Sequence, residues 1–160
     1  MLAVGLIVAS VTDARSGRIP NALTFPMVAL GIAIHAAGAP PWAGLLGAAV
    51  AFAIHFPLFA LGVERGGDAK LLMGVGACVG WSELCETSIW LAVLYFPLGL
   101  LILALRGKLG NLVAAARYTA AKAQGVDPGE KPEPTTFRTG PVIAVAATLA
   151  WATDVFALWR

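Results

Sequence analysis

The segment Gly66-Gly67-Asp68-Ala69-Lys70 places a carboxylate and an ammonium group directly before the apolar run at residues 71–80. A charged group at the edge of a membrane segment is costly, so its presence calls for an explanation. Two adjacent glycines precede the acid, and glycine is common where backbones approach closely or turn sharply. A second acid, Asp13, follows another apolar run, residues 1–11. The function that these two segments indicate depends on whether Asp13 and Asp68 lie close together in the folded protein.

The composition indicates an integral membrane protein. Of the 160 residues, 59% are apolar and 12% are charged, whereas a soluble domain carries roughly 25% charged residues. No basic segment precedes the first apolar run, so we do not expect a cleaved signal peptide. The formal net charge of +2 is too small to indicate nucleic-acid binding. Cys78 and Cys85 form no CxxC pair and are expected to be small apolar residues of the interior.

The apolar runs predict an all-α, polytopic membrane protein with six transmembrane helices. A spanning helix needs about 20 apolar residues, and prolines, glycines and charged stretches separate the runs. We expect helices at residues 1–12, 22–38, 42–63, 68–81, 87–105 and 140–159, and a short acidic loop at residues 82–86. The chain is expected to be one membrane-embedded domain, residues 1–160, that contains a large polar loop at residues 106–138. The first half of that loop has a helical pattern that fits either an amphipathic interfacial helix or a solvated segment.

The basic residues predict the orientation of this bundle. Three polar segments, at residues 13–21, 64–70 and 106–138, share one side of the membrane if there are six spans. They hold ten of the 11 lysines and arginines: Arg15, Arg18, Arg65, Lys70, Arg106, Lys108, Arg117, Lys122, Lys131 and Arg138. Loops rich in these residues are cytoplasmic by the positive-inside rule. Both termini are then expected on the outer, periplasmic side, and Asp13 and Asp68 lie at one depth, at the cytoplasmic edge.

Two carboxylates at one depth can share a proton, because neighbouring like charges cannot both ionise cheaply. Such a pair can activate a water and protonate a leaving amine, as in aspartic proteases. The helix dipole favours charge on Asp68 and disfavours it on Asp13. We therefore expect Asp68 to be ionised and Asp13 to carry the proton, with Lys70 reinforcing this preference. A simpler interpretation also fits, in which both acids are solvated loop residues, Asp13 paired with Arg15 or Arg18 and Asp68 with Lys70.

The combination of Asp13-Ala14-Arg15, Ile19-Pro20-Asn21 and Gly67-Asp68-Ala69-Lys70-Leu71 resembles the type IV prepilin peptidase family. The small size of the chain resembles the Tad/Flp-pilus branch of that family. These proteins are GxGD-type aspartic peptidases of the bacterial inner membrane, and they cleave the leader from prepilins at the cytoplasmic face. The resemblance implies that the catalytic residues are Asp13 and Asp68. The residues it implies in supporting roles are Gly66, Gly67, Lys70, Arg15, Pro20 and Asn21.

The resemblance also implies the partners of the protein and a departure from the family pattern. It implies a hydrolase that needs no cofactor and no metal, with a type IV or Flp-like prepilin as substrate and membrane lipid and the pilus assembly machinery as further partners. Bifunctional members carry two CxxC pairs and an N-methyltransferase activity, whereas this chain has no CxxC, so peptidase activity alone is expected. Arg65 stands where the GxGD pattern has its first glycine.

Two other functions remain open. A transporter or channel component could use Asp13 and Asp68 as ion or proton sites, but such sites usually lie near the bilayer midplane, whereas these acids are predicted at its edge. A GxGD intramembrane protease with other substrates also fits. His35 and His55 fall within apolar helices, where we expect interhelical hydrogen bonds. Asn21 is expected to cap the helix that follows it, and Asp154 to lie at the outer interface.

Overall fold

The computed structural model describes residues 1–38, 40–61, 64–107, 109–130 and 138–153, and all regular structure within them is helical. This confirms the all-α prediction for the described part of the chain. The helices are α1 (Leu2–Ser16), α2 (Asn21–Ala36), α3 (Ala43–Leu61), α4 (Gly66–Val79), α5 (Trp81–Leu105), α6 (Leu109–Ala123) and α7 (Gly140–Thr153). Among the described helices, two are long and apolar enough to cross a membrane: α3, over Ala43–Ala60, and α5. α2 and α7 are also apolar but shorter.

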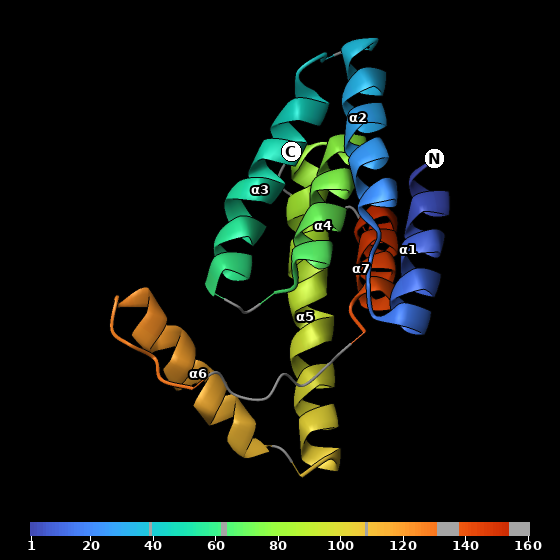
Figure 1. The fold of residues 1–160 in the computed structure, drawn as a ribbon. Helices are drawn as coiled ribbons and strands as arrows, with labels where there is room; N and C mark the ends of the chain where they lie inside the picture. The colour runs from blue at the N-terminus through green and yellow to red at the C-terminus, as the bar shows by residue number, and fades with distance from the viewer. Residues whose placement is uncertain (39, 62–63, 108, 131–137, 154–160) are drawn as a thin grey trace.

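α4 is the central helix of the bundle (Figure 1). It packs most extensively against α2 and α3, and it also contacts α1, α5 and α7. α7 lies between α1 and α5 and contacts both of them. α6 stands apart from the other helices in Figure 1 and contacts α5 and α3. The helix that opens with Gly66-Gly67-Asp68 is therefore the one around which the others are arranged.

Glycines allow α4 to lie very close to its neighbours. A Cβ added to Gly47 of α3 would lie 1.9 Å from the carbonyl oxygen of Gly76 in α4, and one added to Gly76 would lie 2.4 Å from the carbonyl oxygen of Gly47. On the other side of α4, a Cβ on Gly31 of α2 would lie 2.6 Å from the carbonyl carbon of Ala77. Small residues at helix contacts are typical of membrane bundles, because lipid supplies no hydrophobic force between helices and close packing must hold them together.

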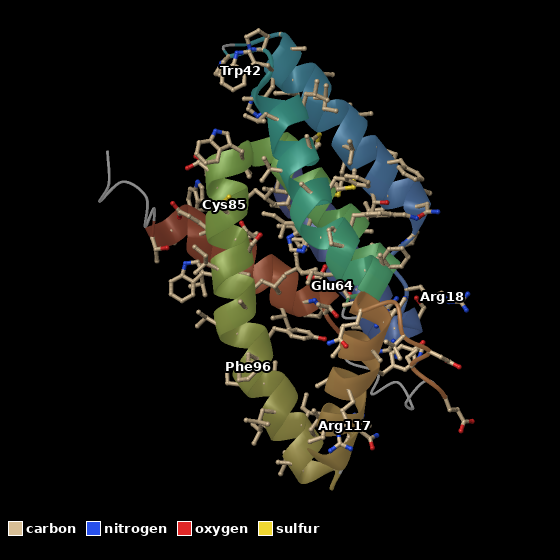
Figure 2. All side chains as sticks on the ribbon, turned by 90° about the vertical axis from the view of Figure 1, so that its left-hand side faces the viewer. Arg18, Trp42, Glu64, Cys85, Phe96 and Arg117 are labelled. Carbon is tan, nitrogen blue, oxygen red and sulfur yellow. The ribbon has the colours of Figure 1, made fainter. Side chains whose placement is uncertain are left out.

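The outer surface of the bundle is rich in large apolar side chains (Figure 2). Exposed examples on different helices are Val4, Phe25, Phe52, Phe96 and Trp151. Soluble monomers rarely expose large contiguous apolar surfaces. This surface is therefore of the kind that lipid would cover.

The predicted helix boundaries are wrong in two places. α1 continues to Ser16, so Asp13 lies in its last turn rather than in a loop, and Gly17 ends the helix with a φ of 68°. The expected acidic loop at residues 82–86 does not form, because these residues belong to the first turns of α5. Gly80, with a φ of 91°, makes the turn between α4 and α5 by itself, since glycine adopts positive φ without a steric penalty. The helices expected at residues 22–38, 42–63 and 68–81 begin and end within two residues of α2, α3 and α4.

The polar loop contains a helix, and one prediction falls beyond the described chain. The helical first half expected for residues 106–138 corresponds to α6. The helix expected at residues 140–159 begins at Gly140, and α7 is described as far as Thr153. Asp154 lies outside the described residues.

Candidate active site

α1 and α4 bring Asp13 and Asp68 to the same end of the bundle. Asp13, in the last turn of α1, is 0% exposed, and Asp68, in the first turn of α4, is 4% exposed. Both carboxylates lie beside the guanidinium of Arg65, with Asp13 Oδ1 2.7 Å from Nη2 and Asp68 Oδ2 3.9 Å from Nε. Neither acid is the solvated loop residue of the simpler interpretation, since both are buried.

The start of α4 determines where Asp68 points. Arg65 is the N-cap residue and has an extended backbone, and Asp68 follows three residues later on the same face of the helix. A Cβ on Gly66 would lie 3.1 Å from the ring of Phe59, and one on Gly67 would lie 3.3 Å from Cβ of Ile19. The two glycines therefore let the first turn of α4 fit tightly between neighbouring segments.

Asp13 accepts hydrogen bonds on both of its carboxylate oxygens. Arg65 Nη2 donates to Oδ1 at 2.7 Å, and the backbone N–H of Gly140 donates to Oδ2 at 2.9 Å. Arg65 Nη2 also donates to the carbonyl oxygen of Gly17 at 2.6 Å, which ties the guanidinium to the end of α1. Gly140 is the first residue of α7, and a Cβ on it would lie 2.9 Å from Cβ of Asp13. α7 therefore supplies part of the site through a backbone group that only a glycine can bring so close.

The carboxyl group of Asp68 is less fully hydrogen-bonded than that of Asp13. Its carboxyl group has a hydrogen bond with the side chain of Thr139. Its Oδ1 atom is buried and has no hydrogen-bond partner among the residues that the structure describes. Buried polar atoms without partners are rare, and each one asks for an explanation.

A cavity of about 320 Å³ lies beside Asp68, between α3, α4, α5 and the residue that precedes α7. A water molecule occupies roughly 30 Å³ in the liquid, so the cavity has room for a water together with a side chain. Its apolar wall includes Leu72, Leu91 and Phe96. Its polar wall is formed by His55, Glu64, Arg65, Asp68, Ser88, Tyr95 and Thr139.

Glu64 and its partners in this cavity were not predicted from the sequence. His55 Nδ1 lies 3.0 Å from both carboxylate oxygens of Glu64, and its Nε2 lies 3.2 Å from Ser88 Oγ. The sequence prediction assigned no carboxylate to His55. A signal was present, because Glu64 is the first charged residue after a long uncharged run and stands nine positions after His55. The interhelical hydrogen bond expected for His35 is confirmed, since its Nε2 lies 3.2 Å from the carbonyl oxygen of Cys78.

Lys70 and Asn21 contact each other rather than the acids. Lys70 Nζ donates to Asn21 Oδ1 at 3.0 Å and lies 5.5 Å from the centre of the Phe25 ring. The predicted pairing of Lys70 with Asp68 is therefore wrong. The predicted capping role of Asn21 is also wrong, because Pro20 is the N-cap residue of α2 and no side chain caps that helix. This pair instead joins the first residue of α2 to α4.

The basic partner of Asp13 is also different from either arginine named in the simpler interpretation. Arg15 is exposed in the last turn of α1, and Arg18 is exposed just beyond it. Asp13 pairs with Arg65, which is 52 residues away in the sequence. Sequence proximity pointed to the wrong arginines because the buried side of α1 faces α4 and α7.

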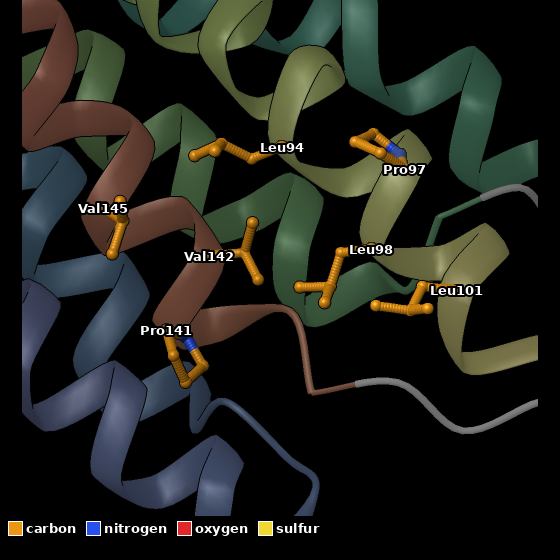
Figure 3. A pocket seen from close by; sticks show the side chains of 7 residues that line it. All are labelled: Leu94, Pro97, Leu98, Leu101, Pro141, Val142 and Val145. Carbon is orange, nitrogen blue, oxygen red and sulfur yellow. The ribbon is translucent and has the colours of Figure 1, made fainter. Parts of the chain in front are cut away.

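A second groove, of about 460 Å³, lies between α5 and α7 and is lined by apolar side chains (Figure 3). It begins at Pro141, the residue after the Gly140 that donates to Asp13. Its lining side chains are Leu94, Pro97, Leu98, Leu101, Pro141, Val142 and Val145. The acids thus have a polar cavity and an apolar groove close to them.

Within the described residues, no group of three or more His, Cys, Asp or Glu side chains is arranged to hold a metal ion.

Comparison with known proteins bears on the same part of the chain. The model of the type IV leader peptidase family matches residues 1–115, which include Asp13, Arg65 and Asp68. α7, with Gly140, lies beyond the matched residues. No curated protein and no solved structure matches the chain.

Proposed function

The chain belongs to the type IV leader peptidase family and is a peptidase of that general kind; we propose that it is a membrane-embedded aspartic endopeptidase that removes the leader peptide of type IV, Flp-like prepilins. One observation carries the aspartic mechanism. Asp13 and Asp68 come from different helices, are both buried, and lie beside one guanidinium at the edge of a cavity. Two buried carboxylates around a single cation favour a state in which one is ionised and one holds a proton.

Asp13 and Asp68 are the catalytic pair in this proposal. The ionised carboxylate takes a proton from a water as the water oxygen bonds to the scissile carbonyl carbon, and the protonated carboxyl gives its proton to the carbonyl oxygen. The C–N bond of the resulting tetrahedral intermediate then breaks as the leaving amine takes the proton that came from water, and a hydroxyl of the intermediate returns its proton to the other carboxylate while it becomes the carbonyl of the new acid. One water is consumed, and one carboxyl of the pair is again ionised and the other protonated. The reaction needs no cofactor.

The supporting residues act through position. Gly66 and Gly67 allow α4 to begin close to Phe59 and Ile19. The hydrogen bond between Lys70 and Asn21 ties α4 to the start of α2, where Pro20 is the N-cap residue. Arg15 is an exposed, positively charged residue in the last turn of α1, the turn that also contains Asp13. In this proposal it faces the aqueous side.

We further propose that the chain forms a single domain of six membrane spans, α1 to α5 and α7, in the bacterial inner membrane, with both termini in the periplasm. The apolar outer surface and the length of α3 and α5 support this topology. α1, α2 and α4 are shorter than about 20 residues and require local thinning of the bilayer. The segment 106–138, with α6, lies on the cytoplasmic side, where the side chain of Lys122 donates to the carbonyl oxygen of Ala60 near the end of α3. The acids then lie at the cytoplasmic face.

The proposed substrate fits the surroundings of the acids. A prepilin has a short basic leader followed by an apolar helix at the start of the mature protein. The apolar groove between α5 and α7 suits such a helix and begins next to Gly140. Cleavage would occur where the apolar segment meets the cytoplasmic interface. Other components of the pilus assembly machinery are further partners in this proposal.

Expression of the protein together with a Flp-type prepilin tests the function. Mass spectrometry of the pilin should show loss of the leader when the wild-type protein is present and retention of the leader with Asp13→Asn or Asp68→Asn. Cleavage of other membrane tails without cleavage of any prepilin would indicate a broader GxGD protease. A proton or ion leak into vesicles that depends on both acids, without proteolysis, would indicate a transporter.

A further inference from the structure

Arg65 occupies the position where the GxGD pattern has its first glycine, and it is the residue that connects the two acids. Its side chain is 33% exposed, yet its guanidinium reaches the fully buried carboxylate of Asp13 at 2.7 Å. The same guanidinium lies 3.9 Å from Asp68 and donates to the carbonyl oxygen of Gly17 at 2.6 Å. An arginine anchored in this way cannot be treated as a neutral replacement of a glycine.

The contacts of the guanidinium are unequal. Asp13 accepts a charge-assisted hydrogen bond from Arg65 and a second hydrogen bond from the backbone of Gly140. Bonds of this kind favour the charged form of a carboxylate. Asp68 has a hydrogen bond with the neutral side chain of Thr139 and the longer, 3.9 Å approach of Arg65 Nε, and its buried Oδ1 has no hydrogen-bond partner among the described residues. A buried oxygen without a donor favours the neutral form of a carboxyl group.

We propose that Arg65 is a positioning residue that sets the charge of the pair, holding Asp13 as the carboxylate and leaving the shared proton on Asp68. This inference rests on the proposed function and deepens it, because it assigns a role to each acid before substrate binds. Asp13 is then the group able to accept a proton from water, and Asp68 is the group able to donate one. The order is the reverse of the one expected from the helix dipole, because a direct ionic hydrogen bond to Asp13 acts more strongly than the field of a helix end.

Several other charged or titratable groups lie near the guanidinium of Arg65. Besides the two acids, these are Glu64 with its partner His55 of α3, Tyr95 of α5, and Arg138, whose side chain packs against Gly17. Glu64 is engaged by His55, and Arg138 adds positive charge beside the end of α1. Arg65, in contrast, has an ion pair with each of the two acids.

The pH profile of leader cleavage tests this role. In Arg65→Gln, Asp13 loses its cation, so the acid limb of the profile should move to higher pH by roughly one to three units. Arg65→Lys keeps the positive charge but lacks the planar guanidinium with its several N–H donors. Its acid limb should therefore lie between those of the wild type and Arg65→Gln. Arg18→Gln removes an exposed arginine from the same end of the molecule (Figure 2) and should leave the profile unchanged. An acid limb in Arg65→Gln that coincides with that of the wild type would overturn the proposal.

A second measurement needs no cleavage and so separates this proposal from the proposed function. The infrared bands of the ionised and the protonated carboxyl group of Asp13 are compared in lipid at one fixed pH, in Asp68→Asn and in the double variant Asp68→Asn/Arg65→Gln. Asp127 and Asp154 are changed to Asn in both, so that isotope-labelled aspartate marks Asp13 alone. Removal of Arg65 should move intensity from the carboxylate band to the protonated carboxyl band. Equal band intensities would show that Arg65 does not set the charge of Asp13, whether or not the protein cleaves a prepilin. If the double variant does not fold, Asp68→Asn/Arg65→Lys should show a smaller change in the same direction, and no change would reject the proposal.

Discussion

The backbone N–H of Gly140 donates to Asp13 Oδ2 at 2.9 Å, although the two residues are 127 positions apart in the sequence. This contact makes α7 part of the candidate active site, even though the family match ends at residue 115. A Cβ on Gly140 would lie 2.9 Å from Cβ of Asp13 and 3.1 Å from the carbonyl oxygen of Ala9. The absence of a side chain is thus what allows the first turn of α7 to reach α1.

Gly140→Ala should lower the rate of leader cleavage by about tenfold or more, because the new methyl group pushes α7 away from α1 and lengthens the hydrogen bond to Asp13. The rate can be followed with purified prepilin in detergent. Gly99→Ala is the matched control, since a Cβ there meets no atom within 4 Å. Equal rates for the two variants would mean that the Gly140 hydrogen bond has no role in catalysis.

Asp13→Asn and Asp68→Asn should each reduce leader cleavage by at least about 10²-fold while the protein still inserts into the membrane. A pair that shares one proton has no spare acid, and an amide neither takes the proton from water nor returns it. Immunoblots of prepilin and membrane fractions give both readouts. Asp127→Asn changes an exposed aspartate in the loop after α6 and should cleave like the wild type. Normal processing by either of the first two variants would rule out the paired mechanism.

Gly76→Ala should destabilise the folded bundle by about 1–3 kcal/mol, because α3 and α4 must move apart to admit the methyl group. The Cβ would lie only 2.4 Å from the backbone carbonyl oxygen of Gly47, and a backbone atom cannot turn aside as a flexible side chain would. Thermal unfolding in detergent measures the change. Gly110→Ala, in α6, has open space around the new Cβ and should show no loss of stability.

Glu64→Gln should lower the stability of the bundle by about 1.5–3 kcal/mol, the usual worth of a hydrogen bond to a charged group. Glu64 joins the segment before α4 to His55 of α3, which is 3% exposed. Comparison of Glu64→Gln and His55→Gln with the double variant isolates the coupling between the two residues. Glu130→Gln, at an exposed position, controls for the removal of a negative charge. Additive effects of the two changes would show that the contact contributes nothing of its own.

The proposed topology predicts which ends of the molecule face the cytoplasm. Trp42, between α2 and α3, and Arg117, in α6, lie at opposite ends of the molecule in Figure 2. In a variant without Cys78 and Cys85, Trp42→Cys should react with an impermeant thiol reagent added to the periplasmic side, whereas Arg117→Cys should react only from the cytoplasm. The reason is the six basic residues of segment 106–138. Periplasmic labelling of Arg117→Cys would overturn the orientation.

Much of the architecture follows from the sequence alone, because a helix satisfies its backbone hydrogen bonds within one continuous segment. Apolar runs and the breaks between them were enough to predict an all-α chain and to locate α2, α3 and α4 within two residues. The sequence also singled out Asp13 and Asp68, since a charged residue at the border of an apolar run stands out without any knowledge of packing. Residues 82–86 were misassigned, because a single glycine, Gly80, makes the turn that an acidic loop was expected to make.

The partners of the two acids were decided by the tertiary structure. Nearby charges in the sequence suggested Arg15, Arg18 or Lys70, whereas Asp13 is bound by Arg65 and Gly140. Which side chain meets a buried carboxylate depends on how each helix is rotated about its axis and how closely its neighbours approach. Those quantities are set jointly by packing contacts such as the one between Gly47 and Gly76, and no single segment contains them. The sequence by itself determined where the acids stand along their helices, and only the packing of α1, α4 and α7 decided which donors reach them.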